Sequence, residues 1–191
     1  MQLILASSSR YRREMLERLR LPFQCISPSI DETPLPGESP VQTCERLGLL
    51  KAKVVANLHP NAIVIGSDQV ADVNGEAISK PGHHEAAVAQ LTAMSGKSIT
   101  FHSAVSVVHQ ASGKEVSFCV STVVEFRTLS AQEIERYLLA EQPYDCAGSA
   151  KSEGLGITLL NRIESCDPTA LIGLPLIELS KALRKLGVSL P

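Results

Sequence analysis

Three arginines begin a predicted helix, at the end where positive charge is least expected. The short apolar run 3–6 predicts a buried strand, three serines follow it, and a helix is expected from about residue 10 to 20. Arg10, Arg12 and Arg13 fall in the first turn of this helix, where each positive charge costs about 0.3–1 kcal/mol unless an anion lies nearby. Free backbone N–H groups, serine hydroxyls and guanidinium groups together favour phosphate binding. The alternative is that the three side chains point into water.

A lysine interrupts the apolar face of the second predicted helix. Ser39 as N-cap and Pro40 at the first helical position place the start of this helix, which is expected to run to about residue 56. At about 100° per residue, Lys51 falls in the middle of the apolar stripe, whose members are Val41, Cys44, Leu47 and Val55. Such a lysine is either a side chain that reaches water from the edge of the helix or a charge with a function.

A carboxylate and an amide interrupt a strand that is otherwise apolar. Residues 61–73 predict a buried strand, and Asp68 and Gln69 lie in its middle. A buried acid needs a partner, a metal or a function, so Asp68 is a candidate active-site residue, with a structural role as the alternative. Lys80 follows the next short strand, where Pro81 fixes the backbone and could aim the lysine back across the sheet.

Two acidic segments are weaker signals. Glu32 follows Asp31 in a proline-rich loop, and Glu153 lies in the cluster 151–154. Taken alone, each is typical of a solvated loop charge. The sequence contains no nucleophile elbow, Walker loop or dinucleotide fingerprint, which excludes several common classes of nucleotide enzyme.

The composition is that of an ordinary globular protein with an aliphatic core. Of 191 residues, 44% are hydrophobic and 20% are charged, and the net charge of -2 argues against a general nucleic-acid binder. Five scattered cysteines without a CxxC pair favour reduced thiols over a disulfide framework or a zinc site. The first residues do not match a signal peptide, and no apolar run approaches the roughly 20 residues that span a bilayer. We therefore expect a soluble, cytoplasmic protein that does not bind membranes.

The remaining pattern predicts an α/β fold with a mixed sheet. The pair Asn74-Gly75 predicts a hairpin turn, and Ser130 with Glu133 forms a capping box at the start of a helix. Further strands are expected at about 23–26, 76–79, 98–108 and 115–127, and further helices at about 83–94, 131–141 and 175–186. Because strands and helices interleave while adjacent hairpins also occur, a mixed sheet with helices packed around it is the expected architecture.

Several short segments, taken together and in their order along the chain, resemble those of the Maf-like pyrophosphatases. The resemblance runs from residue 3 to about 186 and rests on the segments 3–13, Asp31-Glu32-Thr33, Lys51-Ala52-Lys53, Gly66-Ser67-Asp68-Gln69, Lys80-Pro81, 147–154 and Gly173-Leu174-Pro175. It implies a single Maf-like domain over residues 1–191. The implied fold is a mixed twisted β-sheet flanked by helices, in two lobes around a nucleotide cleft, of the Maf/ITPase-like type.

The resemblance also implies an activity. The family hydrolyses the α–β phosphoanhydride of nucleoside triphosphates, so the protein would be a hydrolase that releases a nucleoside monophosphate and pyrophosphate. A divalent cation (Mg²⁺ or Mn²⁺), a homodimer and a role in clearing modified nucleotides are implied too. This chain resembles the branch that acts on 7-methyl-GTP more than the branch that acts on dTTP and UTP. The dTTP and UTP branch has Ser-Pro-Arg-Arg at the first motif and Ala-Asp-Thr at the second, where this chain has Tyr11 and Ser67-Asp68-Gln69. The 7-methyl-GTP branch commonly has tryptophan at the position of Tyr11.

Within this resemblance, the chemistry of phosphate hydrolysis assigns a role to each candidate residue. Phosphate binding is assigned to Ser7, Arg12, Lys51 and Lys80. Asp68 is the candidate general base, directly or through a metal-bound water, and Glu32 is the candidate second carboxylate at the metal.

Base selection is assigned to three other side chains. The ring of 7-methylguanine is positively charged, so stacking on Tyr11 would gain cation–π energy, while Glu153 would accept from the ring N1–H and the exocyclic amine. Gln69 can donate and accept at the remaining edge. Two alternatives stay open: the same reaction on dTTP, UTP or other non-canonical triphosphates, and a nucleotide-binding regulator of septum formation with little turnover, since some family members are described as inhibitors of septum formation.

Overall fold

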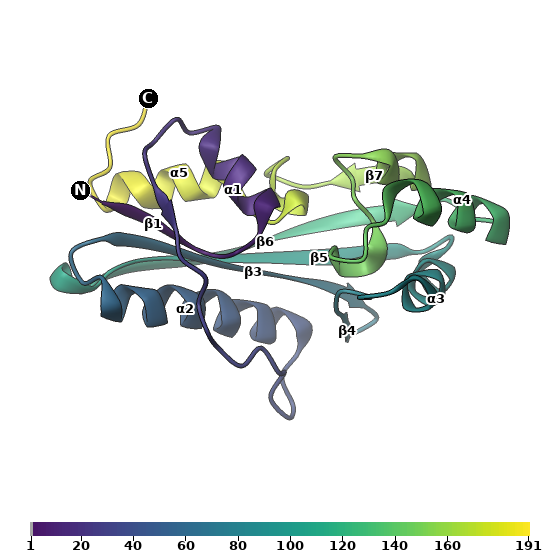
Figure 1. Cartoon of the computed structure of the whole chain (residues 1–191), viewed down its shortest axis with the longest axis horizontal. Helices are drawn as coiled ribbons and strands as arrows, with labels where there is room; N and C mark the ends of the chain where they lie inside the picture. The colour runs from purple at the N-terminus through teal and green to yellow at the C-terminus, as the bar shows by residue number, and fades with distance from the viewer. Residues whose placement is uncertain (1) are drawn as a thin grey trace.

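A seven-stranded mixed sheet runs the length of the protein. The structure is a computed structural model that describes residues 2–191 (Figure 1). The strands lie in the order β2-β1-β3-β5-β6-β7, with β4 paired to β3. Their bounds are β1 Leu3–Ala6, β2 Gln24–Cys25, β3 Ile63–Val73, β4 Glu76–Ile78, β5 Ser98–His109, β6 Lys114–Phe126 and β7 Leu160–Glu164. Strand β1 is parallel to β2 and β3, and every other pairing is antiparallel.

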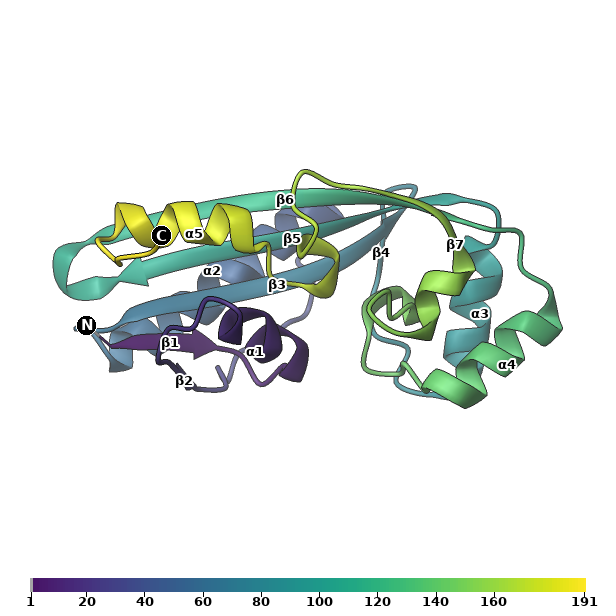
Figure 2. The ribbon, with the colours of Figure 1, turned by 90° about the horizontal axis from the view of Figure 1, so that it is seen from above.

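The helices gather at the two ends of this sheet. Helices α1 (Arg10–Glu17), α2 (Pro40–Leu58) and α5 (Leu176–Lys185) pack at one end, and α3 (His84–Met94) and α4 (Ala131–Glu141) at the other (Figure 2). We call the end with α1, α2 and α5 the first lobe and the end with α3 and α4 the second. In the first lobe α2 covers one face of the sheet, while α1 and α5 cover the opposite face (Figure 1). The predicted mixed α/β architecture in two lobes is therefore confirmed. Within residues 2–191, no helix is long and apolar enough to cross a membrane.

Two predicted helix starts are confirmed in detail. Ser39 caps α2 with Gln42 in a reciprocal capping box, and Ser130 caps α4 with Glu133 in the same way. In both, the serine side chain accepts the third backbone N–H of the helix and the long polar side chain returns to the N-cap.

Two elements differ from the prediction. Helix α1 ends at Glu17 rather than near Arg20, because the N–H groups of residues 18–20 bond carbonyls three residues back and Arg20 adopts φ 53°. The sequence pattern predicts no strand at residues 160–164, which form β7. Most of its residues are exposed, so they show no apolar alternation, and a register shift at Glu125 and Phe126 of β6 disturbs its pairing.

The edge of β3 is left open over a short stretch in its middle. On that side β1 pairs with β3 as far as Gly66, and β4 pairs only from Ala71 onward. Over residues 67–70 no strand of the described chain covers this edge, although β5 pairs with all of them on the other side. The carboxyl end of β1 points into the same opening, which is where ligands bind in open α/β sheets. Asp68 lies within this gap.

Helix α2 approaches β3 unusually closely next to the gap. A Cβ atom built on Gly66 would overlap the carbonyl oxygen of Gly48 and the backbone nitrogen of Ala52. These atoms belong to the helix backbone, which cannot rotate away as a flexible side chain would. The glycine at position 66 therefore sets the spacing between α2 and the sheet.

We predict that Gly66→Ala lowers the free energy of unfolding by about 3 kcal/mol or more, because the added methyl group overpacks this contact. Gly75→Ala is the matched control. Gly75 has φ 88° and open space around its Cα, so only backbone strain, about 1 kcal/mol, is expected there. Urea denaturation of both variants measures the difference, and equal losses would contradict the close approach.

Candidate active site

A cavity of about 630 Å³ lies at the gap in the edge of β3. It is bounded by the first turn of α1, the buried face of α2, strands β3 and β4, and the segment that follows α4. Every side chain that the sequence assigned to the site lines it, namely Ser7, Tyr11, Arg12, Glu32, Lys51, Asp68, Gln69, Lys80 and Glu153. Segments far apart in the sequence thus converge on one cavity, while the role of each residue stays a prediction.

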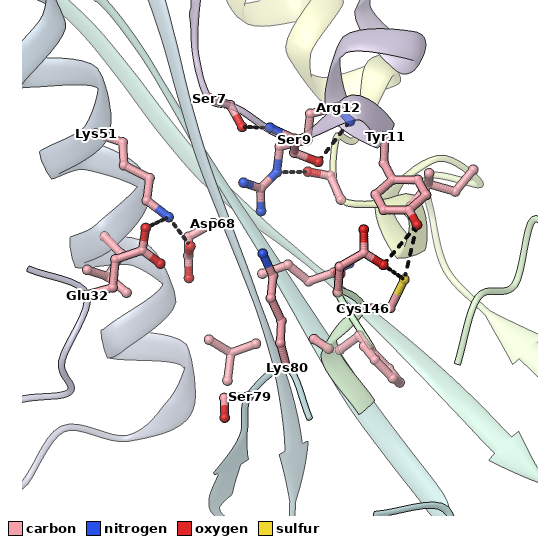
Figure 3. A pocket seen from close by; sticks show the side chains of 18 of the residues that line it. Ser7, Ser9, Tyr11, Arg12, Glu32, Lys51, Asp68, Ser79, Lys80 and Cys146 are labelled. Carbon is pink, nitrogen blue, oxygen red and sulfur yellow. Dashed lines mark hydrogen bonds and ion pairs between the residues drawn. The ribbon is translucent and has the colours of Figure 1, made fainter. Parts of the chain in front are cut away.

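A buried ion pair stands on one side of the cavity (Figure 3). The Lys51 ammonium lies 2.6 Å from Oδ1 of Asp68 and 3.0 Å from Oε1 of Glu32. Lys51 and Asp68 are only 5% and 6% exposed, as their positions in an apolar stripe and a buried strand predict. Because one ammonium contacts both acids, it holds the two carboxylates side by side at the cavity wall.

The second oxygen of Asp68 is free to act on a ligand. Oδ2 makes no hydrogen bond with the described residues, and Asp68 lines the cavity. The backbone at this point pairs with β5, and the Cys44 thiol of α2 lies 3.3 Å from the carbonyl oxygen of Asp68 and 3.2 Å from that of His102. Asp68 is therefore held rigidly through its backbone and one oxygen, with the other oxygen presented to the cavity.

A backbone carbonyl aims Arg12 into the cavity. Its Nε donates to the carbonyl oxygen of Gly173 at 3.1 Å, and Ser67 of β3 donates to the same oxygen at 3.0 Å. With Nε occupied, the two Nη groups point toward the side that carries Lys51 (Figure 3). The arginines of the first turn therefore diverge, because Arg13 pairs with Glu17 on the surface as the alternative interpretation expected.

The start of α1 retains unpaired backbone donors. Ser9 is the N-cap and accepts from Arg12 N, while the Ser7 hydroxyl accepts from Ser9 N at 3.1 Å. The N–H groups of Arg10 and Tyr11 have no acceptor among residues 2–191. Two N–H groups at the positive end of the helix are thus available to an anion in the cavity.

Lys80 enters the cavity from the opposite lobe. It follows β4 and is exposed, and its ammonium points into the cavity between the ion pair and Tyr11 (Figure 3). It forms no ion pair with the carboxylates of the described residues. Its charge is therefore available to a ligand that lies between the two lobes.

Paired charges hold the loop that carries Glu32. Arg46 of α2 donates through Nη2 to the Thr33 carbonyl at 3.1 Å and to Oε2 of Glu38 at 2.8 Å. These bonds from Arg46, with one from the Leu35 N–H, lower the pKa of Glu38 to about 2. The carboxylate is thus charged throughout the physiological range, and the loop stays docked on α2.

Tyr11 and the segment after α4 form the other side of the cavity. The Tyr11 hydroxyl donates to Oδ1 of Asp145 at 3.2 Å, and the Cys146 sulfur lies 3.6 Å from the same hydroxyl. Burial raises the pKa of Cys146 to about 11, and the nearby charges of Asp145 and Glu153 add to this effect. Asp145 and Glu153 therefore place two carboxylates on this side of the cavity, and Arg10 lies 3.8 Å from the first of them.

A separate ion pair supports the loop that carries Glu153. Glu141 at the end of α4 accepts from the Lys151 ammonium at 2.7 Å and from the Leu155 N–H at 2.7 Å. The Lys151 bond lowers the pKa of Glu141. A Cβ on Gly154 would lie 2.7 Å from a Glu141 carboxylate oxygen, so glycine is needed for this contact.

The Gln69 side chain has fewer free hydrogen-bonding groups than the sequence suggested. Its Nε2 donates to the Ser103 hydroxyl and to the carbonyls of Ala170 and Leu171, at 2.9–3.1 Å. Only Oε1 remains for a ligand, so the expectation that Gln69 both donates and accepts at a base edge needs correction. Its amide instead ties β3 to the loop that carries Gly173.

Sequence reasoning missed the group that holds this loop. Asp167 is fully buried and accepts from Thr169 through Oδ1 and from the N–H groups of Ile177 and Glu178 through Oδ2. It caps α5 from a position nine residues before the first residue of the helix, a spacing that no local capping pattern covers. The side chain therefore fixes the loop that presents the Gly173 carbonyl.

The carboxylates of the site fit a metal that takes most of its ligands from substrate and water. The described residues contain no group of three or more His, Cys, Asp or Glu side chains arranged to hold an ion. Glu32 and Asp68 nevertheless share one ammonium at the cavity wall. Two carboxylates without a protein cage are typical of Mg²⁺ bound together with phosphate oxygens.

Comparisons with known proteins show the family of the chain. A family model described as "Maf-like protein" matches residues 2–186. A 7-methyl-GTP pyrophosphatase of Polaromonas sp. strain JS666 is 58% identical over 98% of this chain and 86% of its own length. A 7-methyl-GTP pyrophosphatase of Ralstonia nicotianae is 59% identical over 95% of this chain and 94% of its own length. Among solved structures, the Ham1 protein of Staphylococcus aureus is similar with a TM-score of 0.48 and 18% identity, covering 67% of this chain and 73% of that one.

We predict that Asp167→Ala lowers the free energy of unfolding by about 3 kcal/mol, because it leaves several buried donors without acceptors. Asp31→Ala is the matched control. Asp31 accepts a similar bond from Thr33 N at 2.9 Å, but it is exposed and caps no helix. Denaturation of both variants in urea measures the two losses, and a small loss for Asp167→Ala would show that the loop is held by other contacts.

Proposed function

Because the chain belongs to the Maf-like family, we propose that it is a nucleoside triphosphate pyrophosphatase that hydrolyses 7-methyl-GTP to 7-methyl-GMP and pyrophosphate. The observation that carries this proposal is the convergence of Arg12, Lys51 and Lys80 with the single strand carboxylate of Asp68 around one cavity. The full-length relatives named 7-methyl-GTP pyrophosphatase support both the reaction and the substrate. The biological role that corresponds to this activity is to remove a methylated nucleotide from the pool of nucleoside triphosphates.

The triphosphate lies along the basic side of the cavity in this proposal. Arg12 offers two Nη donors, the first turn of α1 offers two backbone N–H groups, and Lys80 offers an unpaired ammonium from the other lobe. Fixed donors of this kind stabilise charge that develops on phosphate oxygens without reorganising during the reaction. Ser7, buried beside the helix start, completes the set.

Asp68 acts as the general base in this mechanism. Lys51 holds Oδ1 at 2.6 Å, so Oδ2 is presented to the cavity and accepts a proton from the attacking water. The oxygen of that water then attacks the α-phosphorus, and pyrophosphate leaves with its charge balanced by the cationic side chains. Lys51 orients the base.

We propose that Mg²⁺ or Mn²⁺ is held by Glu32 and Asp68. Both carboxylates contact Lys51 and face the cavity. When bound, the ion neutralises phosphate charge and lowers the pKa of a coordinated water. Arg46 and Glu38 serve this site by keeping the loop with Glu32 docked.

The base lies on the acidic side of the cavity. The aromatic ring of Tyr11 attracts a cationic purine by about 0.5–2 kcal/mol. Glu153 accepts from the N–H groups of the guanine edge, and Oε1 of Gln69 is an additional acceptor. The family resemblance further implies a homodimer, and the scattered cysteines of the sequence favour the cytoplasm.

We predict that 7-methyl-GTP has the highest kcat/KM in a panel with GTP, dTTP and UTP. The panel is assayed for pyrophosphate with Mg²⁺ or Mn²⁺, and with a chelator, which should abolish turnover. Preference for dTTP or UTP would instead support the same reaction on pyrimidine nucleotides. Nucleotide binding without pyrophosphate release would overturn the enzyme assignment in favour of a binding regulator.

Asp68→Asn should reduce turnover by about 1,000-fold while the protein remains folded, because an amide cannot accept the proton. Asp72→Asn is the matched control. Asp72 lies four residues further along β3, outside the cavity, so its loss of charge should leave the rate nearly unchanged. Near-wild-type pyrophosphate release by Asp68→Asn, measured at saturating substrate, would refute the role of Asp68.

A further inference from the structure

The two sides of the cavity carry opposite charge. Arg12, Lys51 and Lys80 line one side together with the carboxylates of Glu32 and Asp68, which pair with Lys51, whereas Asp145 and Glu153 line the other. Arg10 is the cation that faces the acidic side, at 3.8 Å from Oδ2 of Asp145. A ligand that fills the cavity and displaces Arg10 would therefore meet cations at one end and two carboxylates at the other.

Arg10 is bound as a cationic ligand would be bound. Its guanidinium carbon lies 4.7 Å from the centroid of the Tyr11 ring, and Nη2 donates to the Tyr11 hydroxyl at 2.6 Å. Neighbouring residues of a helix point about 100° apart, so this side chain bends back over the ring while it stays largely exposed. The Tyr11 hydroxyl in turn donates to Asp145, which keeps the ring and the carboxylate together.

We propose that Tyr11 and Asp145 form a cation-recognition subsite, which Arg10 occupies in the free enzyme and the positively charged purine ring of the substrate takes over on binding. Asp145 is then a specificity-determining residue that selects for charge on the base. This inference rests on the proposed function, since 7-methylguanine is the cationic base considered there.

Physical chemistry explains how such a subsite discriminates. When a neutral base displaces Arg10, the guanidinium loses its contacts with Tyr11 and Asp145, and no positive charge replaces it beside Asp145. A cationic base restores both the stacking on Tyr11 and the charge balance. Arg10 is 64% exposed and Asp145 is 54% exposed, so the arginine can move into water without breaking the core.

The test compares 7-methyl-GMP with 7-deaza-7-methyl-GMP, which has the same shape but no ring charge. Affinities are measured calorimetrically at mildly acidic pH, where the methylated base keeps its N1 proton and its positive charge. Wild-type protein should bind the cationic nucleotide more tightly. Asp145→Asn should reduce this preference by about fivefold, because one charge pair is lost.

Arg10→Met provides a second variant with a different expectation. Without the competing guanidinium, both nucleotides should bind about threefold more tightly, because neither has to displace Arg10, whereas the preference between them should stay as in wild type. Glu164→Gln, an exposed change on β7 outside the cavity, controls for net charge and should leave the preference unchanged. An unchanged preference in Asp145→Asn, or unchanged affinities for both nucleotides in Arg10→Met, would overturn the proposal.

Turnover of 7-methyl-GTP, measured separately, distinguishes a failure of the subsite from a failure of the proposed activity. If wild type releases pyrophosphate but Asp145→Asn keeps the full preference, only the subsite is wrong. If wild type releases none yet the preference changes as expected, the subsite stands and the proposed activity fails.

Discussion

The buried ion pair between Lys51 and Asp68 is the interaction on which the site depends. Removing both charges from water costs free energy, and an apolar pair of similar volume would often be equally stable or more so. The pair is therefore poorly explained by stability alone. Its geometry fits a role in catalysis better, because it gives a charged carboxylate one fixed oxygen and one free oxygen and also holds Glu32.

The close packing of α2 on β3 makes this pair possible. Gly66 lets the helix backbone approach the strand, and the Cys44 thiol bonds the carbonyl of Asp68 itself. The opening between β1 and β4 then exposes the strand edge at this point. A carboxylate that would otherwise be enclosed in the sheet is thereby both buried on one side and accessible to a ligand on the other.

Long-range bonds position the remaining side chains of the site. The Gly173 carbonyl orients Arg12, and its loop is held in turn by Gln69 and Asp167. Glu141 fixes the loop of Glu153 from the other lobe. The resulting cavity has a basic side and an acidic side, which matches a nucleotide with an anionic triphosphate and a cationic base better than one with a neutral base.

The sequence by itself determined the helix caps, most strand and helix bounds, and the anomalous charges at Arg12, Lys51 and Asp68. These features depend on neighbours in the chain, through capping, periodicity and the cost of burying a charge. Only the tertiary structure decided that Arg10 and Arg12 line the cavity while Arg13 does not, that Gln69 is bound to a loop, and that Asp167 caps a helix from nine residues before it. It also placed Asp145 beside Tyr11, 134 residues away in the chain. Such contacts follow from sheet order and loop packing, which local patterns do not encode.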